Sequence, residues 1–261
     1  MRFTTVLAAE RLKLRGSRVP FLTLLAFALG PLGGGLFMWI VQEPGRAAEL
    51  GLMGTKADLV GLEASWAGYL TMITQMVGIV GGLLLAVIAA YVYGREYAEG
   101  TAKNMLALPL PRWWFVVAKL MVVAVWWLVL VAVILVEGVA VAVALGLSGY
   151  SAAVLLAGAG DVFLAALVVF LLTPVVAWLA TLGRGYLPPL GFAMLALVLG
   201  NVLGATGWGK WFPWSIAPLF AGVAGPRVEV LARGSLFVVA VTFVVGVAAT
   251  VAQVRWADVD E

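Results

Sequence analysis

Long apolar runs separated by short polar segments dominate this chain. Six of these runs are long enough to cross a hydrocarbon core of about 30 Å, which takes about 20 helical residues. They cover residues 19–41, 66–98, 113–147, 152–182, 188–206 and 236–254. The pattern predicts an all-α integral membrane protein with six transmembrane helices, forming a single transmembrane domain over residues 1–261.

The third run allows two interpretations. Residues 113–147 exceed what one untilted crossing needs, and only Glu137 and Gly138 interrupt the apolar pattern. Two crossings would need a turn that the sequence does not supply. We therefore predict one long helix that is tilted or bent.

Two shorter segments flank the spans. Residues 1–18 carry five basic side chains against a single Glu10, with apolar residues at helical spacing. They predict an amphipathic helix on the membrane surface. Residues 207–234 are rich in tryptophan and proline, too interrupted to span and too apolar for a free loop. They predict a re-entrant or interfacial hairpin on the outer side.

Composition places the chain in the membrane class and narrows the chemistry. Apolar residues make up 64% and charged residues 11%, and the mean hydropathy is +1.10. The absence of cysteine and histidine removes disulfides, thiol nucleophiles, the usual general base and the commonest metal ligand. We expect no catalytic, cofactor-binding or metal site. A net charge of +3, widely dispersed, does not favour nucleic acid as a partner.

Basic residues also predict the topology, because cytoplasmic loops are enriched in lysine and arginine. Placing both termini inside gives an inner-to-outer split of eleven to five. The inner set is Arg2, Arg11, Lys13, Arg15, Arg18, Arg95, Lys103, Arg112, Lys119, Arg184 and Arg255, and the outer set is Arg46, Lys56, Lys210, Arg227 and Arg233. Both termini and the segment between spans two and three are therefore expected in the cytoplasm.

That segment, residues 91–112, carries the residue types expected where one helix ends and another begins after a bend, and we call it the elbow. Gly100 suits the left-handed conformation that ends a helix. Thr101 can cap a new helix over residues 102–108, which must end before Pro109. We predict a short, charged helix at the cytoplasmic surface.

Residues 95–112 carry a more specific pattern. The segment contains, in this order, a Gly-Thr pair preceded by glutamates, a Lys-Asn pair followed by leucines, and a proline followed by a final arginine. It lies between the second and third of the six predicted spans. The segment resembles the signature of type-two ABC transporter permeases, among them peptide-antibiotic immunity and bacitracin-type permeases. The basic lead with Glu10, Lys13, Leu14 and Arg15 is similar to that family too. Pro111 departs from the pattern, where a small or polar residue is common.

The resemblance implies a permease subunit of an ATP-driven exporter that is not itself an enzyme. Residues 101–108 would be a coupling helix that docks into a separate ABC ATP-binding subunit. Two copies of that subunit would bind ATP and magnesium and drive a homodimer or heterodimer of permeases in the bacterial cytoplasmic membrane. The residues assigned to coupling are Glu96, Glu99, Gly100, Thr101, Lys103, Asn104, Met105, Leu106, Pro109 and Arg112. The apolar spans suggest an amphipathic, peptide or lipid-like substrate moving outward, with membrane lipid as a further partner.

Besides Arg95 and Glu96 at the end of the second run, three charged residues fall within the apolar runs. Glu137 and Asp161 are possible intramembrane polar sites, because a carboxylate in lipid is costly unless it has a function. Both lie in outward parts of their runs, so partial solvation is the competing interpretation. Lys119 is expected to extend to the inner interface.

Two other function classes stay open. An ion-coupled secondary transporter would need intramembrane ion sites, and Glu137 and Asp161 are few residues from which to build them. A non-transporting membrane scaffold could recruit a cytosolic partner through the same elbow.

Overall fold

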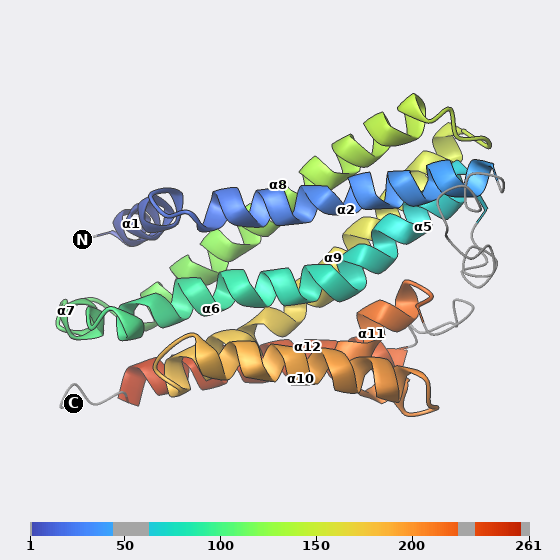
Figure 1. The fold of residues 1–261 in the computed structure, drawn as a ribbon. Helices are drawn as coiled ribbons and strands as arrows, with labels where there is room; N and C mark the ends of the chain where they lie inside the picture. Colours follow the sequence, from blue (N-terminus) through green and yellow to red (C-terminus); the bar gives the residue numbers. More distant parts are fainter. Residues whose placement is uncertain (1, 44–62, 224–232, 257–261) are drawn as a thin grey trace.

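The computed structural model describes residues 2–43, 63–223 and 233–256. Within these ranges the chain forms helices and no strand (Figure 1). The elements are α1 (Phe3–Arg15), α2 (Val19–Gln42), α5 (Trp66–Met76), η1 (Val77–Gly81), α6 (Gly82–Ala98), α7 (Ala102–Leu106), α8 (Trp113–Ala144), α9 (Ala152–Leu182), α10 (Leu187–Gly204), η2 (Gly209–Trp211), α11 (Pro213–Phe220) and α12 (Arg233–Trp256). Part of the predicted 207–234 hairpin, residues 224–232, lies outside the described residues.

Six of these helical stretches are long and apolar enough to cross a membrane: α2, α5 to α6 taken together, α8, α9, α10 and α12. This confirms the predicted six-helix, all-α membrane fold. The α9 helix is central and packs against α5, α6, α10, α11 and α12. The helices α1 and α7 and the last turn of α12 lie at one end of the bundle (Figure 1).

The third run is a single helix, α8, as the sequence predicts. It ends at Ala144 rather than at residue 147, because Gly146 adopts a φ of 60° and the amide of Leu147 returns to the carbonyl of Ala142 at 3.2 Å. This left-handed glycine closes the helix in the usual way.

The second span is not a uniform α-helix. A π-helical turn, η1, interrupts it at Val77–Gly81. Two glycines there allow close packing: a Cβ on Gly81 would lie 2.8 Å from the ring of Trp127, and one on Gly78 would lie 3.1 Å from the carbonyl oxygen of Ala217 on α11. The turn therefore lies where α8 and α11 both pack closely against the span.

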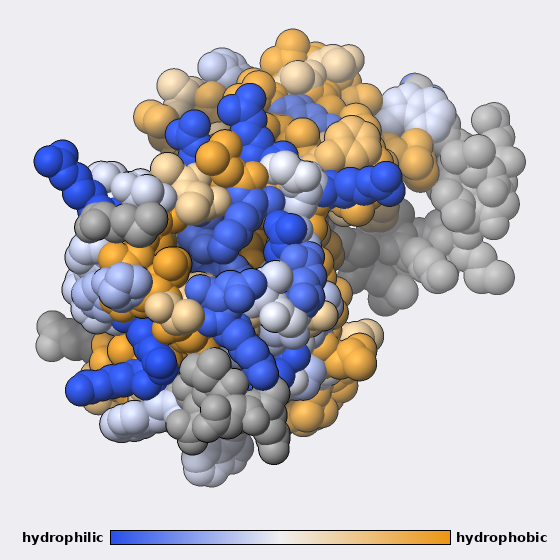
Figure 2. All heavy atoms as spheres, turned by 90° about the vertical axis from the view of Figure 1, so that its left-hand side faces the viewer, coloured by the Kyte–Doolittle hydropathy of each residue, from blue (hydrophilic) through white to orange (hydrophobic). Residues whose placement is uncertain are grey.

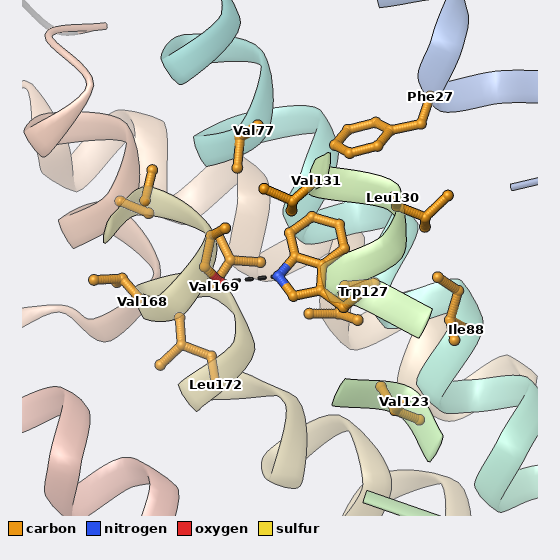
Figure 3. Close-up of a cluster of buried hydrophobic side chains, with 14 of the residues drawn as sticks. Phe27, Val77, Ile88, Val123, Trp127, Leu130, Val131, Val168, Val169 and Leu172 are labelled. Carbon is orange, nitrogen blue, oxygen red and sulfur yellow. Dashed lines mark hydrogen bonds between the residues drawn. The ribbon is translucent and has the colours of Figure 1, made fainter. Parts of the chain in front are cut away.

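The core of the bundle is centred on Trp127 of α8 (Figure 3). Its ring is 2% exposed and packs against Phe27 of α2 at 5.5 Å between ring centroids. Its indole nitrogen donates a hydrogen bond to the carbonyl of Ala166 on α9 at 3.0 Å. One side chain thus joins three spans and satisfies its polar atom.

Candidate functional site: the elbow and helix α1

The elbow bends where α6 ends. Gly100 has a φ of 70°, its amide donates to the carbonyl of Tyr97 at 3.2 Å, and the amide of Thr101 donates to the carbonyl of Glu96 at 2.8 Å. These two bonds form a Schellman motif, which satisfies the last carbonyls of the helix. The predicted helix stop at Gly100 is confirmed.

The short helix differs from the prediction in two ways. It ends at Leu106 rather than at residue 108. The chain then turns, and the amide of Leu110 donates a hydrogen bond to the carbonyl of Leu108 at 2.7 Å. Thr101 does not cap the helix with its side chain; its hydroxyl donates to the carbonyl of Glu96 at 3.4 Å. Thr101 has helical φ and ψ, whereas side-chain capping needs an extended residue.

Four charged side chains from three helices meet beside the elbow. The ammonium of Lys119 on α8 donates to Glu96 Oε1 on α6 at 2.7 Å and to Glu10 Oε2 on α1 at 3.0 Å. Its third bond goes to the carbonyl of Val92 at 2.7 Å. Lys13 donates to Glu10 Oε1 at 2.7 Å and to Glu96 Oε1 at 3.0 Å. We call Glu10, Lys13, Glu96 and Lys119 the charge cluster.

The charge cluster is balanced and mostly buried. The side chains of Glu10, Glu96 and Lys119 are 4–5% exposed, and Lys13 is the outer member at 40%. The carboxylates at bonding distance hold the ammonium of Lys119 inside the bundle, and its position relative to the inner interface stays a prediction. Burial by itself would lower the pKa of Lys13, but the carboxylates of Glu10 and Glu96 outweigh it and raise that pKa above its ordinary value.

Helix α1 reaches this cluster because of its own periodicity. Its inward face carries Val6, Glu10 and Leu14, four residues apart. A second tie lies nearby: Arg95 of α6 donates to the carbonyl of Lys13, in the last turn of α1, at 3.3 Å. The α1 helix is thus fixed to both the second and the third span.

The elbow is also tied at its far end. Arg112 donates through Nη1 to the carbonyls of Val254 at 3.2 Å and Arg255 at 3.0 Å. These carbonyls belong to the last turn of α12, where a cation is favoured by the helix dipole. The two ends of the elbow therefore contact different parts of the bundle.

The coupling residues predicted from the resemblance fall into two groups. Met105 and Leu106 are 8% exposed and turn towards the protein. Lys103 and Asn104 are exposed, as are Thr101 and Pro109, and Glu99 forms an exposed ion pair with Arg95 at 2.9 Å. Figure 2 shows hydrophilic side chains gathered on this end of the bundle.

A groove of about 460 Å³ runs between α1 and the elbow. Thr5 and Ala9 of α1 line one side, and Asn104 and Leu108 line the other. The exposed part of the elbow thus borders a recess that another protein surface could enter.

Glu137 and Asp161 do not join this site. Glu137 lies on α8, and one of its carboxylate oxygens is buried without a hydrogen-bond partner among the described residues. Asp161 is partly buried on α9. No group of three or more histidine, cysteine, aspartate or glutamate side chains that could hold a metal ion occurs in the described ranges.

Sequence reasoning missed the charge cluster as a unit. Glu10 is the single acid in a basic helix and Lys119 the single cation in a long apolar run. A buried charge needs a partner of opposite sign, so two single, opposite charges in apolar surroundings are the signal that could have predicted the contact between Glu10 and Lys119.

Comparisons with known proteins identify the family of this chain. Residues 6–200 match the model of the family described as ABC-2 family transporter protein. Over 183 residues, covering 69% of this chain and 86% of the relative, the chain is 30% identical to the bacitracin transport permease protein BCRB of Bacillus licheniformis. No solved structure matches the chain. This chain therefore belongs to the ABC-2 transporter family, as a multi-pass membrane permease of the kind that works with an ABC ATP-binding partner.

Proposed function

We propose that this chain is the permease subunit of an ATP-driven exporter in the bacterial cytoplasmic membrane. Both termini lie in the cytoplasm, α1 lies along the inner membrane surface, and α11 is part of a re-entrant segment on the outer side. Two permeases, identical or different, pair with two ATP-binding subunits, which bind ATP and magnesium. This chain binds no cofactor and hydrolyses nothing.

The bracing of the elbow carries this proposal. The helix α7 is joined to α6 by the Schellman motif, and the charge cluster and Arg112 fix its surroundings to α1, α8 and α12. Movement imposed on α7 would therefore reach several spans together, which a free loop would not allow.

We further propose a division of labour within the elbow. Lys103, Asn104 and Leu108 are exposed and contact the ATP-binding subunit. Met105 and Leu106 are buried and anchor α7 to the permease. The similarity to a bacitracin transport permease of Bacillus licheniformis supports a peptide as the amphipathic substrate.

The test is to express the chain together with its ABC ATP-binding partner. In lipid nanodiscs, the variant K103E/N104A/L108D should lose most copurification and most permease-stimulated ATP hydrolysis. Arg18→Ala removes an exposed cation next to α2 and serves as the control, with wild-type behaviour expected. Unchanged complex formation and unchanged stimulation in the triple variant would contradict the docking role. Substrate movement driven by an ion gradient without nucleotide would favour a secondary transporter.

A further inference from the structure

A second groove lies on the flank of the bundle, where α1 passes the beginning of α2 and the side of α8. Its volume is about 530 Å³. Apolar side chains of α1, α2 and α8 form its floor and walls, and two arginines of α1 stand at its rim. Its lining includes Arg11, Leu14, Arg15, Met121, Val125 and Trp126.

The groove has a fixed wall and an open side. The indole nitrogen of Trp126 donates to Thr23 Oγ1 of α2 at 3.1 Å, which holds the ring between two spans. Met121 and Val125 are 43% and 62% exposed and face outward from α8. Since these residues belong to a span, the open side faces the acyl chains of the bilayer.

The rim carries two positive charges. Arg11 and Arg15 are four residues apart and so lie on one face of α1. Neither forms an ion pair with another residue in the part of the chain that the structure describes. The single carboxylate of α1, on Glu10, is engaged by Lys13 and Lys119.

We propose that this groove binds one anionic phospholipid. Its phosphate is held by the guanidinium groups of Arg11 and Arg15, which suit phosphate geometry, and one acyl chain lies along Met121 and Val125. The elbow groove suits such a lipid less well, because the three carboxylates in its lining, Glu10, Glu96 and Glu99, outnumber its two cations, Lys13 and Arg95. The assignment does not depend on the ATP-binding partner.

Native mass spectrometry of the full-length chain in detergent, titrated with phosphatidylglycerol, tests the proposal. The variant R11Q/R15Q should bind this lipid roughly 30-fold more weakly, from about two favourable cationic contacts. The variant R2Q/R18Q removes the same two charges from positions on either side of α1 that do not line the groove, and it should leave the affinity unchanged. Phosphatidylcholine should bind more weakly than phosphatidylglycerol to the wild-type chain.

A second variant separates a formed site from general attraction to an anionic surface. Val125→Trp keeps both arginines but fills the acyl-chain floor, and its exposed position leaves the core intact. Loss of bound phosphatidylglycerol is expected. Undiminished binding in Val125→Trp or in R11Q/R15Q would overturn the proposal, as would displacement of the lipid by an equal concentration of inorganic phosphate. Size-exclusion profiles confirm that each variant is folded.

Discussion

The ammonium of Lys119 on α8 lies 2.7 Å from a carboxylate oxygen of Glu96 on α6, and both side chains are almost completely buried. This ion pair joins the third span to the last turn before the elbow. Its strength depends on both partners being present, because a single buried charge without its counter-ion is costly.

Replacing Lys119 with methionine should therefore lower the free energy of unfolding by about 3–5 kcal/mol, since Glu10 and Glu96 would keep only Lys13. The free energy of unfolding of the double variant E96Q/K119M should fall by clearly less than the sum of the losses in the two single variants, because Glu10 and Lys13 still pair. Thermal unfolding in detergent measures both. Strictly additive losses would mean that the pair is not coupled.

The orientation of α7 predicts a contrast between neighbouring residues. Met105→Ala removes a buried side chain and should lower the free energy of unfolding by about 2–3 kcal/mol. Asn104→Ala, at an exposed position, should change it by less than about 0.5 kcal/mol. Equal effects in thermal unfolding would show that α7 is not seated through Met105.

Gly100 predicts a purely conformational cost. A Cβ at this position would meet no atom within 4 Å, but φ is 70°, so Gly100→Ala should destabilise by about 1–2 kcal/mol. Gly33→Ala is the matched control, because its Cβ would also meet open space within the helix α2, and it should be neutral or slightly stabilising. The two melting temperatures give the comparison.

Arg112 predicts an effect far away in the sequence. Arg112→Gln removes the bonds to the carbonyls of Val254 and Arg255, so amide hydrogens in the last turn of α12 should exchange several-fold faster. Arg255→Gln leaves those carbonyls in place and should keep wild-type exchange. Hydrogen exchange read by mass spectrometry distinguishes them, and equal protection in Arg112→Gln would contradict the tie.

The sequence was sufficient for the helices because membrane thickness sets their length and glycine marks their ends, as at Gly100 and Gly146. It was insufficient where the outcome depends on packing. The bond from Lys119 to Glu10 joins residues 109 positions apart, and only the folded bundle brings them together. Thr101 has the right chemistry for a cap, but its helical backbone angles keep the hydroxyl from the amides that follow.

The π-helical turn at Val77–Gly81 sets the rotational phase between the two halves of the second span. Each residue of an α-helix turns the chain by about 100°. The one extra residue in the π-helical turn therefore changes the direction in which the inward face of α5 points relative to that of α6. Shortening the chain by one residue here would swing Tyr69 and Leu70 away from their neighbours while Glu96 stayed beside Lys119.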